Sequence, residues 1–79
     1  MSDLTEYQEI EIVASSLKRD GLNDVANNLL HAHEGIYNNT ELYSTWRQCL
    51  DEIVHLPRVS GDTRIRAKRL YGIFDSYLT

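Results

Sequence analysis

The sequence has little cysteine and no long apolar run. The single cysteine among its 79 residues, Cys49, cannot form a disulfide within the chain, and no Cys or Cys/His spacing typical of structural zinc is present. No apolar stretch approaches the roughly 18 residues that would span a bilayer. Residues 1–6 are acidic and lack the basic and apolar regions of a secretory signal. We therefore expect a cytoplasmic protein without membrane attachment.

The chain is also short. With 42% hydrophobic and 25% charged residues it has the composition of a folding chain. A core of this size rarely supports a catalytic cleft, which needs several polar groups held rigidly around a pocket. We expect one domain over residues 1–79 that binds a partner, with no enzymatic activity and no cofactor.

Apolar residues recur at spacings of three and four, the period of amphipathic helices, in four segments. They predict helices over residues 4–19, 24–34, from about Thr40 to the turn before Pro57, and 63–77. No segment alternates with the period of a strand. The sequence thus predicts an all-α fold, a compact four-helix domain with short connections, whose first two helices form an antiparallel hairpin.

Turn and cap residues separate these segments. Gly21 is suited to the left-handed position that ends the first helix. Asn23, Thr40 and Asp62 are the expected N-caps of the following three. Trp46 is expected at the centre of the core. Gly72, inside the last helix, suggests either a neighbour packed against its backbone or a bend.

The residues that could carry chemistry form no recognisable site. His31 and His33 are two positions apart on a helix and therefore point in different directions, so they cannot bind one metal ion together. Cys49 lies within an apolar stripe and is expected to be a small buried residue. We predict neither a catalytic residue nor a metal site.

Charge is unevenly distributed along the chain, whose net charge is -4. Residues 1–40 contain seven acidic and two basic side chains, whereas residues 41–79 contain five acidic and six basic ones. The first hairpin could therefore present a negative surface to a basic partner, or simply a solvated face.

A basic run over residues 64–69 lies near the start of the last helix, where cations oppose the helix dipole. These cations could pair with acids of the first helix, which is the preferred interpretation. They could also contact phosphate or a protein partner. The acidic net charge makes nucleic-acid binding the less favoured of these.

Tyrosine supplies five of the seven aromatic residues, and it combines contact area with a polar tip, as interfaces require. Tyr37 and Tyr43 are the expected exposed anchors. The candidate partner-binding residues are Glu6, Glu9, Asp24, Glu34, Tyr37, Glu41 and Tyr43.

About half of the chain resembles a known pattern, carried by Gly21, Leu22, Ala26, Leu29, Ala32, Gly35, Thr40-Glu41-Leu42, Trp46-Arg47, Leu50 and Leu56-Pro57. It is similar to small all-helical bacterial immunity proteins encoded beside polymorphic or contact-dependent toxins. Asn39 and the order Trp46-Arg47 depart from that pattern. The resemblance implies a protein without catalysis that binds a co-produced toxin, such as a ribonuclease or deoxyribonuclease domain, and blocks it by occlusion. It assigns no individual binding residue.

Two other functions remain open. A small regulatory or nucleic-acid-associated adaptor would use the basic last helix, with Arg66 and Arg69 as contacts. A homodimeric module would pair exposed apolar residues, for which Ile12 and Ile36 are candidates.

Overall fold

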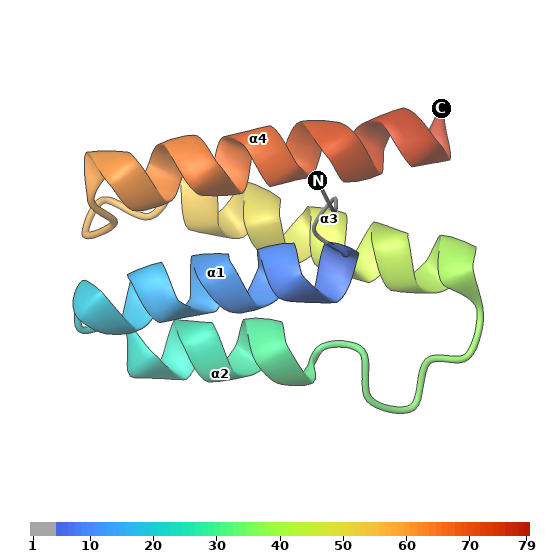
Figure 1. The fold of residues 1–79 in the computed structure, drawn as a ribbon, viewed down its shortest axis with the longest axis horizontal. Coiled ribbons are helices and arrows are strands. Elements are labelled where there is room, and N and C mark those ends of the chain that lie inside the picture. Colours follow the sequence, from blue (N-terminus) through green and yellow to red (C-terminus); the bar gives the residue numbers. More distant parts are fainter. Residues whose placement is uncertain (1–4) are drawn as a thin grey trace.

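Successive helices run in opposite directions around a shared core. The computed structural model describes residues 5–79 and contains α1 (Glu6–Arg19), α2 (Asn23–His31), α3 (Asn39–Val54) and α4 (Gly61–Leu78). α1 lies between α2 and α4, and α3 packs closely on α4 but only sparsely on α2 (Figure 1). The predicted all-α four-helix domain is confirmed. None of the helices from residue 5 onward is long and apolar enough to cross a membrane. Leu4, predicted as the start of the first helix, lies outside the described residues.

α1 is secured at both ends. Thr5 and Gln8 form a capping box: the Thr5 hydroxyl accepts from the Gln8 amide at 3.2 Å, and the Gln8 side chain accepts from the Thr5 amide at 2.8 Å. At the other end Gly21 adopts a φ of 81° and donates to the Lys18 carbonyl. The Leu22 amide donates to the Leu17 carbonyl at 2.9 Å, which completes a Schellman turn. The predicted glycine cap and antiparallel hairpin are confirmed.

α2 is shorter than predicted. It begins at Asn23, which was expected to be its cap, and the cap position is instead taken by Leu22, which has no side-chain acceptor. It ends at His31 rather than Glu34, because the chain turns there. The Glu34 amide donates to the His31 carbonyl at 3.1 Å, and Gly35 takes a left-handed φ of 78°.

The caps of α3 and α4 also differ from the prediction by two residues. Asn38, not Thr40, caps α3, accepting from the amide three residues on at 3.1 Å. Ser60, not Asp62, caps α4 in the same way at 3.3 Å. Apolar periodicity cannot show which of several nearby polar residues is the N-cap, because a single hydrogen bond within the first turn decides this.

The core is centred on Trp46, as predicted. This side chain is fully buried, with its ring centre 5.4 Å from that of Phe74. Leucines from all four helices complete the interior, namely Leu17, Leu29, Leu42, Leu50 and Leu70. Gly72 is exposed and nothing lies within 4 Å of where its Cβ would be, so no close neighbour explains it.

The basic run of α4 is largely engaged within the protein. Arg64 donates to the carbonyls of Val54 and Leu56, at 3.0 and 2.8 Å, and thereby caps the end of α3. Arg69 approaches Glu9 of α1 to 3.5 Å. The predicted pairing of this run with acids of the first helix is thus confirmed for Arg69, while Arg64 serves the adjacent helix instead.

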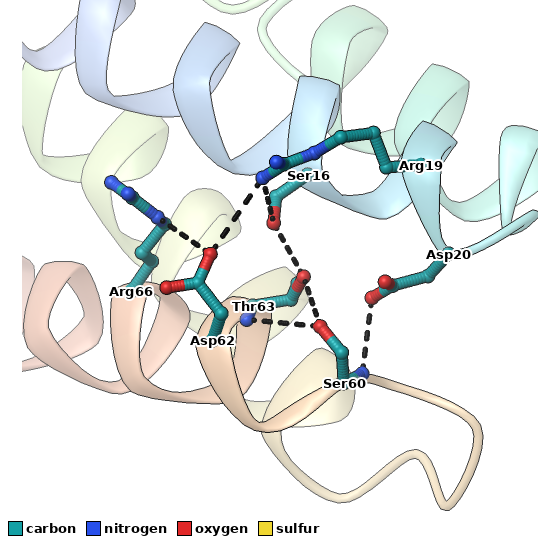
Figure 2. A network of polar contacts seen from close by, with 7 residues as sticks. All are labelled: Ser16, Arg19, Asp20, Ser60, Asp62, Thr63 and Arg66. Atoms are coloured by element: carbon teal, nitrogen blue, oxygen red, sulfur yellow. Dashed lines mark hydrogen bonds and ion pairs between the residues drawn. The ribbon is translucent and has the colours of Figure 1, made fainter.

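A polar network joins the end of α1 to the start of α4 (Figure 2). Its centre is a hydrogen bond between the buried hydroxyls of Ser16 and Thr63. Around it Ser60 donates to Thr63 at 3.0 Å, and the Ser60 amide donates to Asp20 at 3.0 Å. The network continues outward through Arg19, Asp62 and Arg66. These hydrogen bonds can all form only at one relative position of the two helices. The network therefore fixes the axial register of α1 against α4.

Asp20 should make part of the stability depend on pH. The Ser60 amide, followed by the Thr63 hydroxyl, holds the pKa of the Asp20 carboxyl below its usual range. A depressed pKa stabilises the folded state above the unfolded pKa of about 4, and this contribution is lost as pH falls through the folded pKa. Urea unfolding from pH 7 to pH 3 should therefore show Asp20→Asn less stable at pH 7, with the difference from the parent narrowing below about pH 4. A constant difference would contradict this role.

Candidate partner-binding surface

Aromatic rings extend from the core to the surface at one end of the bundle, where α1 and α3 begin and α4 ends (Figure 1). From Trp46, one path leads to Tyr7, with ring centres 5.1 Å apart and nearly perpendicular. The other leads through Phe74 to Tyr43 at 5.4 Å and on to Tyr77 at 5.2 Å. Tyr7 and Tyr77 are 50% and 55% exposed, and Tyr43 is partly buried. We call Tyr7, Tyr43 and Tyr77 the tyrosine cluster.

A carboxylate accompanies the tyrosine cluster. The pKa of Tyr43 is raised, and burial is the main cause. The negative charge of Glu6 raises this pKa further, and Tyr77 and Tyr7 make smaller contributions. The Tyr43 hydroxyl therefore stays protonated at neutral pH and can donate a hydrogen bond. The first residue of α1 and the last turn of α4 are thus both within electrostatic reach of Tyr43.

Basic side chains are scarce at this end. No lysine or arginine occurs in residues 5–17, 32–46 or 70–79, and all eight lie at 18–19, 47 and 58–69. Because the helices alternate in direction, this places the basic residues toward the opposite end, apart from Arg47 in the middle of α3. Arg47 is neutralised by Asp75 at 2.7 Å. The charge asymmetry between the first and second halves of the chain is therefore accompanied by a second asymmetry, which runs along the bundle axis.

Most of the predicted partner-binding residues gather at the same end as the tyrosine cluster. Tyr43 belongs to the cluster, and Tyr37 is 97% exposed in the connection between α2 and α3. Glu34 lies in the turn after α2, where it pairs with His31 at 3.2 Å. The acids that begin α1 and α3 complete this group, namely Glu6 and Glu41.

Two predicted residues do not belong to this group. The Glu9 side chain is only 17% exposed and is occupied by Arg69, so it is not a free acid. Asp24 is in the first turn of α2, which places it at the opposite end of the bundle. The sequence shows that each of these side chains is acidic and helical, but it gives neither the ion-pair partner of Glu9 nor the end of the bundle at which Asp24 lies.

The prediction missed Tyr7 and Tyr77 as surface residues. Both fit the apolar periodicity of their helices, which favours a position facing the core. In a bundle of alternating helices the first turn of α1 and the last turn of α4 lie at the same end. The positions of Tyr7 and Tyr77 in these turns were therefore the signal in the sequence that could have placed both at this end. His33, half-buried, extends the group, with its ring centre 5.5 Å from that of Tyr7.

Cys49 was predicted to be buried, and it is partly buried and packs against the core. It lines a hollow of about 160 Å³ between α2 and α3, together with Val25, Asn28, Leu29, Glu52, Ile53 and Leu56. Burial, and then the charge of Glu52, raise the pKa of the Cys49 thiol, which disfavours the reactive thiolate. Within residues 5–79 no group of three or more His, Cys, Asp or Glu side chains is arranged to hold a metal ion.

The apolar residues suggested for a homodimer contact are not exposed. Ile12 and Ile36 are both half-buried, and Ile36 packs against the core. Apart from Tyr7, Tyr37 and Tyr77, the large exposed hydrophobic residue among those described is Ile65, on the basic part of α4.

A scan against protein-family models found no match, and searches of curated proteins and of solved structures found no similar chain.

Proposed function

We propose that this protein is a non-catalytic inhibitor that binds a basic protein partner with the end of the bundle that carries the tyrosine cluster. The cognate partner is a toxin that acts on nucleic acid, a ribonuclease or deoxyribonuclease domain. The inhibitor and the toxin are made by the same cell, and they bind each other in its cytoplasm. The observation that carries the proposal is the combination of half-exposed tyrosines with several carboxylates and few lysine or arginine side chains at one end. Nuclease grooves that bind phosphate are basic, and this surface is complementary to them.

The tyrosines and the acids would have different tasks in such a complex. Partly exposed rings anchored on Trp46 and Phe74 offer contact area that is already ordered, so little conformational freedom is lost on binding. The carboxylates of Glu6 and Glu41 would mainly attract the partner and raise the association rate. Inhibition would follow from covering the groove, without chemistry on either protein.

The proposal is tested by coexpression with the product of the neighbouring open reading frame, with the affinity tag on that product. We expect a one-to-one complex and restored growth of a host that the neighbour alone inhibits. A neighbour that is harmless alone and does not copurify would contradict the proposal.

The acids give a kinetic prediction. The double variant Glu6→Gln/Glu41→Gln should slow association by about threefold to tenfold at low salt, and should make the rate less dependent on salt. The matched control is Asp24→Asn/Glu52→Gln, which removes the same charge from exposed residues toward the other end. Stopped-flow or surface-binding kinetics would measure both. Equal rates for the two double variants would contradict steering by the tyrosine end.

A nucleic-acid adaptor is the second candidate, since Lys68 and Ile65 are exposed on α4. It is less well supported, because Arg66 pairs with Asp62 at 3.2 Å and Arg69 pairs with an α1 acid. Retention of the protein on DNA or RNA that falls with salt and is lost when Arg66 and Arg69 are neutralised would favour it instead.

A further inference from the structure

The tyrosine cluster has the elements of a receptor for a single positively charged side chain. The Tyr43 and Tyr77 ring centres are 5.2 Å apart, and their planes are tilted by 34°. Glu6 begins α1, one residue before Tyr7, and its negative charge contributes to the raised pKa of Tyr43. Two of the three rings are about half exposed, so their faces and edges are accessible from solvent.

The cluster's surroundings favour a cation over a purely apolar group. Ring faces carry the negative part of the aromatic quadrupole, and they attract a cation most when a carboxylate is nearby and no protein cation competes. Here α1 up to Leu17, the start of α3 up to Trp46, and α4 from Leu70 onward contain no lysine or arginine. Among the described residues, the Arg47 guanidinium, one turn after Tyr43, is already neutralised by Asp75 at 2.7 Å.

We infer that Tyr7, Tyr43 and Tyr77, together with Glu6, bind one arginine side chain of the protein partner. Arginine fits better than lysine, because its guanidinium is planar and weakly hydrated and can stack on a ring while donating to a carboxylate. This inference rests on the proposed function and specifies it: the partner presents an arginine at the centre of its basic surface.

The inference is tested on the protein alone with Nα-acetyl-arginine amide, and with Nα-acetyl-citrulline amide as a neutral probe of the same shape. Aromatic NMR spectra recorded during millimolar titrations would locate each probe. We expect the arginine probe to shift the ring signals of Tyr7, Tyr43 and Tyr77 and to bind about twofold to fivefold more tightly than citrulline. Equal binding of the two probes, shifts mapping elsewhere, or no binding would overturn the inference. Tighter binding of the corresponding lysine amide would overturn the choice of arginine.

Matched variants separate the site from a general effect. Tyr77→Leu keeps an apolar side chain but removes the ring, so it should weaken binding of both probes. Glu6→Gln removes the charge, so it should weaken the arginine probe and leave citrulline unchanged. Tyr37→Leu is the control, since that ring is 97% exposed and makes no ring contact with the cluster. Thermal unfolding followed by circular dichroism would verify that each variant is folded.

The outcome is independent of the test of inhibition. If the neighbouring gene product binds and growth is restored but the arginine probe shows no preference, this inference is wrong and the proposed function stands. If the probe binds as expected but the neighbour is harmless and does not copurify, the proposed function is wrong, and the cation site remains.

Discussion

Replacing Trp46 with alanine should leave the protein largely unfolded at room temperature. The side chain is completely buried, and its ring is in contact range of Tyr7, Phe74 and His33 from three other segments. Removing a buried tryptophan costs about 3–5 kcal/mol. A domain of this size without disulfides or metals rarely has more than about 3–5 kcal/mol of stability.

Urea unfolding monitored by circular dichroism measures this effect, with Tyr37→Ala as the aromatic control. Because Tyr37 is almost fully exposed, its removal should change the free energy of unfolding by less than about 0.5 kcal/mol. A folded Trp46→Ala protein with the midpoint of the parent would show that Trp46 is not the centre of the core. Trp46→Phe should cost less stability than Trp46→Ala, because a ring remains and because the buried Trp46 Nε1–H has no hydrogen-bond partner among residues 5–79.

The hydroxyl pair between α1 and α4 should behave as a unit. Thr63→Val preserves shape but leaves the Ser16 hydroxyl without its buried partner, and also removes the acceptor for Ser60. Such a loss costs about 1–3 kcal/mol, because the Ser16 hydroxyl stays buried and keeps only the hydrogen bond that it accepts from Arg19 at 3.2 Å. Ser16→Ala alone should cost less, since Thr63 keeps its bond to Ser60.

The double variant Ser16→Ala/Thr63→Val is the informative case. Once both hydroxyls are gone, little remains unsatisfied between the two positions, so the double variant should be more stable than the sum of the single losses implies. Urea midpoints of the four proteins measure this coupling. Strict additivity would mean that the two hydroxyls do not depend on each other and that the register of α1 on α4 is fixed by apolar packing alone.

The sequence was sufficient for the architecture because the signals for it are local. Helix periodicity, the glycine at position 21 and the short connection that follows depend on neighbours within a few residues, so the hairpin and the all-α fold could be predicted. The cap residues could not, since Ser60 and Asp62 are both good caps and only the hydrogen bond to Thr63 decides between them. The end of α2 at His31 could not be predicted either, because Glu34 is compatible with both a helix and a turn.

The candidate surface was predicted only in part, because it is assembled from residues distant in sequence. Tyr43 and Glu6 could be identified as an aromatic residue near a helix start and an acid in a first turn. That they lie together with Tyr77 depends on how the first and last helices pack, which no local pattern encodes. The same holds for Glu9, whose availability is determined by Arg69, 60 positions later in the chain.

The position of the chain ends relative to the tyrosine cluster affects how the protein can be handled. α1 begins at Glu6 and α4 ends at Leu78, so the chain enters and leaves the helical bundle at the end that carries the tyrosine cluster. An affinity tag, a surface linker or a fused domain attached at either end would compete for the surface with whatever binds there. The exposed Pro57–Arg58 connection, at the other end of the bundle, would be the better place to immobilise or label the protein.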